Sequence, residues 1–301
     1  MTTDALLAEI RTRIATHASR IPRSRIDGFL VSRVERTEPD YELTDPLVVV
    51  MAQGRKRLYV DREVVEYGAG DCLVVTTSLP LSGHFVGATR ERPALAVGLQ
   101  LRAERIAPLV ARLPRTRANG TGRAAPCRAV ATAPAGASFL DAVARMLRLL
   151  DQPGDIEVLA PMIEREMLWR LLTGPLGPAI AQIGLDDSAL AHVSRAISWI
   201  REHLADPTPV PLLAGVAGMS PATFHRHFRG VTGMTPLQFQ KHLRLQEARS
   251  LLVARAYDVT TAGELVGYQS PTQFNREYRR LFGAPPGRDT RALRRAATQN
   301  A

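Results

Sequence analysis

The sequence predicts an α+β protein of more than one domain. An amino-terminal antiparallel β-sandwich or small barrel with helices is followed by an all-helical region. Short β-rich runs between turn residues fill residues 47–101, which is typical of such all-β architectures. Beyond residue 188 the pattern is helical, and a 17-residue segment occurs twice. A chain of 301 residues is long enough for two cores.

The composition excludes several classes of protein. Hydrophobic residues make up 45% and charged residues 23% of the chain, so intrinsic disorder is not expected. No uncharged run approaches the roughly 18 apolar residues of a spanning helix. Residues 1–13 carry four charges and lack the apolar region of a secretory signal. The two cysteines, Cys72 and Cys127, cannot form a disulfide framework. We therefore expect a cytoplasmic protein with no membrane partner.

Positive charge is concentrated in the carboxyl-terminal region. Of the formal net charge of +10, residues 188–301 carry +8, from fifteen basic and seven acidic residues. Clustered arginine and lysine side chains attract phosphates and displace their counterions. This region is therefore expected to bind a polyanion, although charge alone is also compatible with a well-solvated surface.

The amino-terminal elements follow from hydrophobic patterning. The spacing of Leu6, Leu7, Ile10 and Ile14 predicts a first helix. Strands are expected where β-branched and aromatic residues cluster, at 47–53, 57–60, 63–67, 72–77, 84–89 and 94–101. The subsequent elements are a long loop at 114–138, helices at 139–150 and 156–172, and a linker at 174–187 rich in proline and glycine. The linker divides the chain into domains 1–173 and 188–301.

An internal repeat is the strongest signal in the chain. SPATFHRHFRGVTGMTP (220–236) aligns without gaps with SPTQFNREYRRLFGAPP (270–286), and seven of 17 positions are identical. Serine at the helix N-cap and proline at the first helical position begin each copy. A short apolar helix and a glycine turn precede each copy, which is the helix-turn-helix arrangement. The predicted buried stripes are Phe224, Phe228 and Val231 in the first copy and Phe274, Tyr278 and Leu281 in the second.

The opposite face of each capped helix is polar and basic. It carries Ala222, His225, Arg226 and Arg229 in the first copy and Thr272, Asn275, Arg276 and Arg279 in the second. Between the copies, residues 235–252 predict a connecting helix of roughly 27 Å. This length is close to one turn of DNA, about 34 Å. The two helices are therefore expected to enter successive major grooves of double-stranded DNA.

Residues 189–288 resemble AraC/XylS-type transcriptional regulators. The resemblance is carried by three segments: AGMSPATFHRHF, TGMTPLQFQKHLRLQEAR and VGYQSPTQFNREYRRLFGAPP. Upstream, DPLVVVMAQGRKRLYVDREVVEYGAGDCLVVTTSLPLSGHF is similar to the amino-terminal domain of one AraC subgroup. The resemblance implies a sequence-specific transcription regulator. Residues 1–173 would form a cupin-like effector and dimerisation barrel, and residues 188–301 the double helix-turn-helix domain.

The resemblance also implies partners and residue roles. The partners are double-stranded DNA, RNA polymerase, a small-molecule effector in the barrel and a second copy of the chain, which would dimerise through the helices at 139–150 and 156–172. By position, Ala222, His225, Arg226, Thr272, Asn275 and Arg276 match the base-contacting residues. Arg226 and Arg276 suit guanine, at about 1–3 kcal/mol of discrimination each, and Arg229 and Arg279 suit phosphates. The sequence departs from the family at Gly215 and Gly263, and a helical glycine costs about 1 kcal/mol.

The remaining residues do not point to catalysis. His84 is the one histidine of the strand region, whereas an open catalytic metal site needs about three protein ligands. We expect no catalytic residue, metal or cofactor, and the sequence identifies no pocket. Cys72 is expected to be a buried hydrophobe rather than a redox sensor. The run GRKR (54–57) predicts a hairpin or, alternatively, contact with an anionic effector. An enzyme with a barrel active site and a non-specific architectural DNA protein remain the two rival functions.

Overall fold

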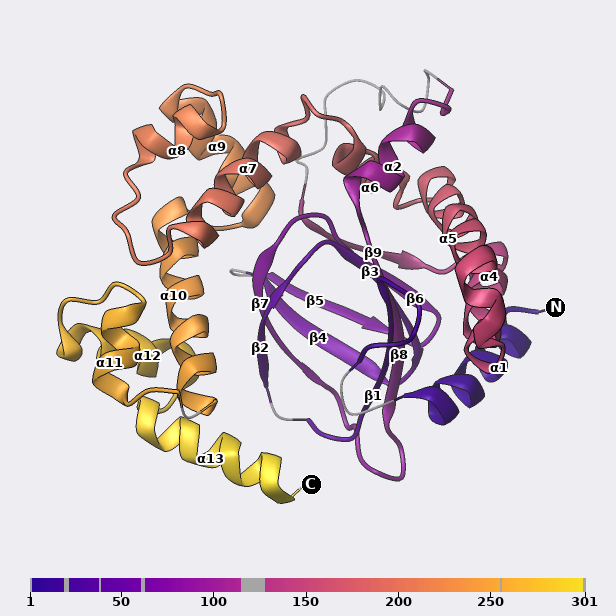
Figure 1. The fold of residues 1–301 in the computed structure, drawn as a ribbon, viewed down its shortest axis with the longest axis horizontal. Coiled ribbons are helices and arrows are strands. Elements are labelled where there is room, and N and C mark those ends of the chain that lie inside the picture. Colours follow the sequence, from indigo (N-terminus) through magenta and orange to yellow (C-terminus); the bar gives the residue numbers. More distant parts are fainter. Residues whose placement is uncertain are drawn as a thin grey trace. The chain divides into compact units, whose positions relative to one another are not determined.

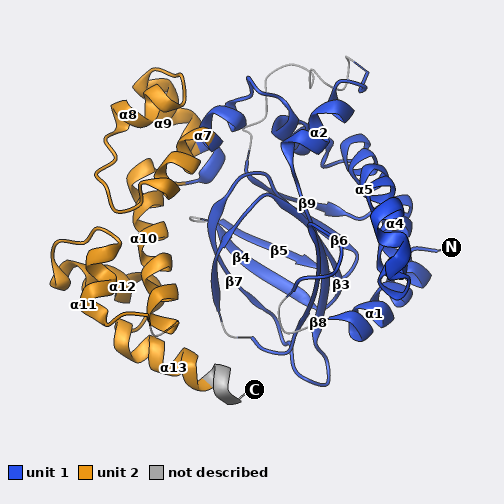
Figure 2. Ribbon diagram, in the orientation of Figure 1, with its two compact units in different colours: residues 1–194, 230–233 blue, residues 195–229, 234–301 orange. Residues whose placement is uncertain are grey.

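The computed structural model describes residues 2–18, 22–37, 39–60, 63–114, 128–254 and 256–299. They form two compact units, one of residues 1–194 with 230–233 and one of residues 195–229 with 234–301 (Figure 2). Within the ranges described, no helix has the length and apolar character needed to cross a bilayer.

Two antiparallel sheets build the first unit (Figure 1). The five-stranded sheet has the order β1 (Phe29–Val34), β8 (Ala94–Gln100), β3 (Leu47–Gln53), β6 (Asp71–Val75) and β9 (Val130–Pro134). The four-stranded sheet has the order β2 (Asp40–Thr44), β7 (Leu79–Phe85), β4 (Arg55–Val60) and β5 (Glu63–Gly68). The described strands of the two sheets are not hydrogen-bonded to each other. The expected barrel is therefore antiparallel, as predicted, but not closed.

Helices cover one face of the five-stranded sheet (Figure 1). They are α1 (Thr3–His17), α2 (Ala103–Val110), α4 (Ala137–Arg148) and α5 (Ile156–Thr173), with 3-10 turns at Leu149–Asp151 and Pro153–Asp155. Alternate residues of β3, such as Val48 and Val50, share a core with these helices. The four apolar residues that predict the first helix are buried in the same core, which confirms α1 and its register.

The strand expected at 84–89 lies instead at 79–85, as β7. Pro80 and Gly83 resemble turn residues in the sequence, but both lie within this strand. Pro80 precedes the ladder with β4, which begins at Ser82, so its missing N–H interrupts no pair there. At Gly83 a Cβ atom would lie 2.6 Å from the carbonyl oxygen of Arg57. This glycine permits close strand approach.

Strands β1, β2 and β9 and helix α2 have no counterpart among the predicted elements. The five residues of β2, DYELT, are mostly polar, and β9, VATAP, lies in the segment expected to be a loop. Pairing with β6 makes β9 a strand despite its weak local signal. Residues 115–127 of that expected loop, including Cys127, lie outside the described residues.

The segment expected to be a linker, 174–187, is largely helical. It contains α6 (Gly177–Ala181) and a 3-10 turn at Gln182–Gly184. Ile180 and Ala181 are buried in the core of the first unit. A Cβ atom at Gly177 would collide with the backbone of Leu172. Gly177 therefore allows the start of α6 to pack directly against the backbone of Leu172 in α5.

The second unit is all-helical (Figure 1). Its helices are α8 (Val210–Val216), α9 (Pro221–Thr232), α10 (Pro236–Val253), α11 (Val259–Leu265), α12 (Pro271–Phe282) and α13 (Pro286–Gln299), and α7 (Ala189–Glu202) leads into it. The end of α9, from Gly230, and the start of α7, up to Ser194, are grouped with the first unit. The predicted connecting helix is confirmed as α10. The Thr235 hydroxyl accepts a hydrogen bond from the Gln238 N–H, and the Gln238 side chain pairs with the Thr235 backbone in return. This capping box fixes the start of α10.

Candidate nucleic-acid interface

Both copies of the repeat fold as a short helix, a glycine turn and a capped second helix. The turns use Gly218 and Gly267, which have positive φ angles of 65° and 89°; glycine tolerates such angles without the steric cost of a side chain. The Ser220 hydroxyl accepts a hydrogen bond from the Thr223 N–H at 3.4 Å, and the Ser270 hydroxyl from the Gln273 N–H at 3.3 Å. The predicted N-caps of α9 and α12 are thus confirmed.

Aromatic side chains bury the inner face of each capped helix. In α9, Phe224 and Phe228 lie 5.3 Å apart between ring centroids, and Phe228 meets Phe239 of α10 edge-on. In α12, Phe274, Tyr278 and Phe282 form the corresponding stripe. The prediction of Leu281 in this stripe is wrong, since Leu281 is half-buried. Phe282 follows Tyr278 at a spacing of four residues, which places it on the same face of the helix, and it is buried there.

The eight predicted contact residues lie together in two sets of four, one on each capped helix. All eight are exposed: Ala222, His225, Arg226 and Arg229 on α9, and Thr272, Asn275, Arg276 and Arg279 on α12. Within the described part of the chain, none of the four arginines forms an ion pair. Their charges therefore face solvent, where a polyanion has access to them.

Asn275 differs from the other exposed residues in its hydrogen bonding. Its side-chain amide donates to the carbonyl oxygen of Pro271, one turn earlier in α12, at 2.8 Å. An asparagine recognises adenine through both its amide and its carbonyl. The bond to Pro271 uses one of the two amide hydrogens, so the second hydrogen and the amide oxygen of Asn275 stay available for a base.

An ionic network holds α12 on its scaffold. The Glu277 carboxylate accepts hydrogen bonds from Lys241 at 2.9 Å and from the Tyr268 hydroxyl at 2.8 Å. Burial raises the pKa of Glu277, but these hydrogen bonds outweigh it and keep the pKa below its ordinary value. Asp289 accepts two hydrogen bonds from Arg249 and one from Tyr278. The outward face of α12 is thus supported by contacts to both α10 and α13.

Arg244 on α10 connects the two helix-turn-helix units. Its guanidinium donates to the carbonyl oxygens of Leu204, Ala205 and Asp206, before α8, and to that of Gly267, in the second turn. Burial lowers the pKa of this guanidinium. A Cβ atom at Gly267 would collide with the Ala205 backbone. Sequence reasoning missed Arg244, because its partners are backbone carbonyls 23 to 40 residues away.

The comparisons with known proteins agree with this geometry. Residues 25–179, half of the chain, match the family model described as the AraC-type transcriptional regulator N-terminus. The chain belongs to the AraC family of transcriptional regulators. Residues 213–292 of this AraC-family regulator match a helix-turn-helix domain, which spans both copies of the repeat. Its relatives are regulators and not enzymes.

Two curated relatives match part of the regulator. YobQ of Bacillus subtilis, an uncharacterized HTH-type transcriptional regulator, is 30% identical over 96 residues, which are 32% of this chain and 40% of YobQ. RclR of Escherichia coli, an RCS-specific HTH-type transcriptional activator, is 32% identical over 123 residues, which are 39% of this chain and 43% of RclR. The chain therefore covers less than half the length of each.

A likeness to solved structures extends over both units. The crystal structure of an apo ToxT variant from Vibrio cholerae has a TM-score of 0.57, with 11% identity. The match covers 89% of this chain and 98% of that one. At this identity the likeness establishes a shared fold for the AraC-family regulator.

Cys72, His84 and the GRKR run each make contacts within the first unit. Cys72 is buried, and burial raises the pKa of its thiol to about 12, with a smaller effect from Asp71; it is not a thiolate at neutral pH. His84 stacks on Tyr59. No group of three or more possible metal ligands occurs among the residues described. In GRKR, Arg55 and Arg57 pair with Glu66, which favours the hairpin over an anion contact.

Proposed function

We propose that this chain is a sequence-specific transcription regulator in which α9 and α12 occupy adjacent major-groove segments of DNA. The observation that carries the proposal is the repeat itself. Two helices with the same serine–proline start and the same aromatic inner face expose matching polar faces. A protein that binds DNA only through general positive charge would not need two copies of the same capped helix.

Each exposed residue has a proposed role. Arg226 and Arg276, in the middle of their helices, contact guanine. Arg229 and Arg279, one turn further on, contact phosphates. The shorter side chains contact the neighbouring base edges, namely Ala222, His225, Thr272 and Asn275.

We further propose that different segments of the chain have different functions. Residues 188–301 form the DNA-binding domain, residues 1–173 the effector and dimerisation domain, and residues 174–187 connect them. Control of transcription would bring RNA polymerase as a partner, and a regulator of chromosomal genes would work in the cytoplasm. A solved ToxT structure is described as bound to an unsaturated fatty acid. This supports a small-molecule effector for the first domain here as well.

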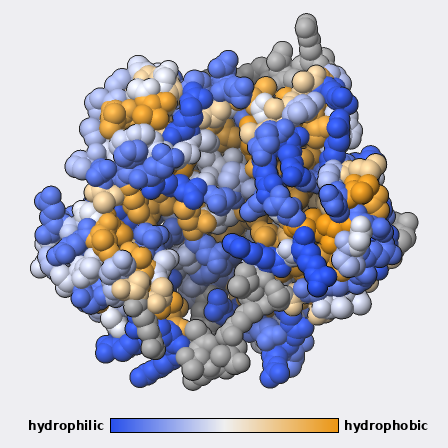
Figure 3. Space-filling model, in the orientation of Figure 1, coloured by the Kyte–Doolittle hydropathy of each residue, from blue (hydrophilic) through white to orange (hydrophobic). Residues whose placement is uncertain are grey.

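A homodimer is supported by one exposed apolar face. Val158 and Met162 on α5 are 66% and 64% exposed, and Leu159 beside them is 38% exposed. Figure 3 shows apolar surface in this part of the first unit, among other places, and the exposed large hydrophobic side chains there belong to α5. Helices bury such faces against other helices. A second copy of α5 is the proposed partner of this face.

Selection of bound fragments from sheared genomic DNA tests the function. We expect the full-length protein to enrich two different half-sites about one helical turn apart. Arg226→Ala and Arg276→Ala should each remove the preference at particular base pairs. Arg229→Ala should weaken binding to all sequences and lower the salt slope by about one charge.

Two results would contradict this function. Uniform recovery of fragments, also with the 188–301 fragment alone, would indicate a non-specific architectural protein. Equal loss of affinity for all DNA in Arg226→Ala and Arg276→Ala would remove these residues from base recognition. The Arg291→Ala variant, which alters an exposed arginine of α13, is the matched control for the loss of one positive charge.

A further inference from the structure

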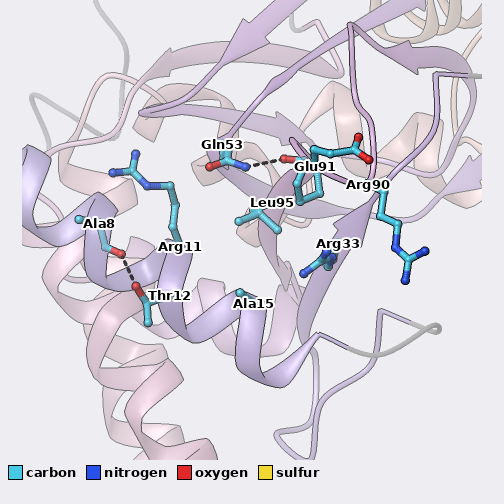
Figure 4. A pocket seen from close by; sticks show the side chains of 10 residues that line it. Ala8, Arg11, Thr12, Ala15, Arg33, Gln53, Arg90, Glu91 and Leu95 are labelled. Carbon is cyan, nitrogen blue, oxygen red and sulfur yellow. Dashed lines mark hydrogen bonds between the residues drawn. The ribbon is translucent and has the colours of Figure 1, made fainter.

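A cleft of about 470 Å³ in the first unit is lined by three arginines from three separate segments (Figure 4). Arg11 belongs to α1, Arg33 to β1, and Arg90 to the loop between β7 and β8. In Figure 4, Arg11 and Arg90 lie on opposite sides of the cleft with their guanidinium groups directed outward, and Arg33 lies nearer to Arg90, so both outer side chains would turn inward to hold a ligand. Buried Leu95 of β8 also lines it. The cleft is therefore basic and polar at its rim.

The cleft carries more positive than negative charge, with three arginines and one glutamate in its lining. Arg11 and Arg90 form no ion pair within the described residues. Arg33 forms an ion pair with Glu35, with 2.8 Å between Arg33 Nε and Glu35 Oε1. Glu91 also lines the cleft, and the pKa of its carboxylate is lowered by its own backbone N–H, by the Thr89 hydroxyl and, to a smaller extent, by the charge of Arg90. A negatively charged ligand would meet Arg11 without an acidic partner, and Arg90 beside the Glu91 carboxylate.

We propose that this cleft binds a small organic anion with two or more carboxylate or phosphate groups, and that this anion is the effector. Guanidinium groups bind both kinds of anion through paired hydrogen bonds. The opposite positions of Arg11 and Arg90 suit a ligand charged at both ends. Gln53 donates one amide hydrogen to the Pro93 carbonyl at 2.8 Å, which leaves the second hydrogen and the amide oxygen for a ligand.

The position of α1 connects this cleft to α4, which packs against α5, the proposed dimer helix. Arg11 lies on the cleft side of α1, whereas Glu9 contacts Arg148 of α4 at 2.7 Å and Arg13 contacts Asp151 just after α4. An anion that joins Arg11 to Arg33 and Arg90 would hold α1 against the sheet. The ligand would thereby favour one arrangement of α1 and α4, which is what an effector requires. This effector role rests on the function proposed above.

Isothermal titration of the full-length protein tests the site directly. The probes are inorganic pyrophosphate and citrate, compared at constant ionic strength, and the tighter of the two identifies the phosphate or the carboxylate class. The Arg11→Gln/Arg90→Gln double variant should bind the preferred probe at least roughly tenfold more weakly, the loss expected for charge-assisted hydrogen bonds. The matched control, Arg92→Gln/Arg112→Gln, removes two exposed arginines that do not line the cleft and should bind like the parent.

Several outcomes would overturn the proposal. The proposal is wrong if neither probe binds, or if the parent and the cleft variant bind the probe equally well. It is also wrong if the control variant loses as much probe affinity as the cleft variant. Anion binding that does not change the affinity of the parent for its selected DNA fragment would overturn the effector role.

The Arg226→Gln/Arg276→Gln variant separates this proposal from the proposed function. It should lose DNA selectivity while retaining the anion affinity of the parent. If the parent selects no DNA but the cleft still binds anion through Arg11 and Arg90, the DNA-binding proposal alone fails. If DNA selection succeeds and the anion does not bind, the cleft proposal alone fails.

Discussion

Two helical glycines of the DNA-binding unit lie in opposite surroundings. Gly215 in α8 is exposed, and a Cβ atom there would meet nothing within 4 Å. Gly263 in α11 is buried, and a Cβ atom there would lie 3.2 Å from the ring of Phe274. Phe274 itself is fully buried and packs against Tyr268 and Tyr278. The glycine at 263 therefore permits α11 and α12 to approach, whereas the glycine at 215 has no such role.

Alanine at these two glycines should have opposite effects on stability. Gly215→Ala should stabilise the chain by about 0.5–1 kcal/mol, because it restricts the unfolded backbone without a clash. Gly263→Ala should destabilise it by roughly 1 kcal/mol, because overpacking against Phe274 outweighs that gain. Urea denaturation followed by circular dichroism measures both changes. Equal gains at both positions would show that Phe274 can move aside.

At the scale of elements, ion pairs fasten α1 to α4. Both carboxylate oxygens of Glu9 accept hydrogen bonds from Arg148 at 2.7 Å, and Arg13 adds a further one at 2.9 Å. The hydrogen bonds from Arg148, opposed by burial and reinforced by Arg13, lower the pKa of Glu9 to about 2. A carboxylate with a lowered pKa contributes stability above its unfolded pKa, and that contribution is lost as the pH falls toward the folded value.

The Glu9→Gln variant should therefore be less stable at neutral pH by about 1–2 kcal/mol. Its deficit should shrink between pH 4.5 and pH 2, as Glu9 becomes protonated in the parent. Trp169 of α5 reports unfolding of the first unit by fluorescence if the other tryptophan is removed in a Trp199→Phe background. The control is Glu157→Gln, an exposed glutamate of α5. A deficit that is the same at pH 3 and pH 7 would contradict this role of Glu9.

Elements with strong local signals were predictable from the sequence, and the others depend on distant partners. Strands such as β3 and β8 are dense in β-branched or aliphatic residues, and α10 begins with a capping box. By contrast, β9 is a strand because it pairs with β6. The exposed faces of α9 and α12 follow from helical periodicity. Arg244 and the arginine-lined cleft bring together residues far apart in the chain, so no local pattern could reveal them.

At the scale of the whole molecule, the spacing of the DNA site depends on how rigidly the two helix-turn-helix units are joined. Arg244 bridges them through four backbone carbonyl groups. Gln240 fastens α10 to the same segment before α8, since its side-chain amide donates to the carbonyl oxygens of Leu204 and Asp206. A rigid junction presents α12 to the DNA at a high effective concentration once α9 has bound.

Arg244→Gln should weaken binding to a complete DNA site by roughly tenfold, because the second unit is no longer held in place. Binding to DNA that contains one half-site should change less than about twofold, because each reading face is intact. Fluorescence anisotropy with both DNAs measures the difference. Arg291→Gln is the matched control on α13. Equal loss on both DNAs would mean that Arg244 supports folding in general rather than the junction.

The exposed faces of α9 and α12 have the same helical spacing but differ at some residues. Arg226 and Arg229 recur as Arg276 and Arg279, but Ala222 corresponds to Thr272 and His225 to Asn275. If these residues contact bases as proposed, the DNA sequence that one chain recognises is not a palindrome, and its two ends are distinguishable. A single bound chain therefore points in one direction along the chromosome. Inverting the site in front of a gene would turn the whole regulator around, even though every protein–DNA contact is preserved.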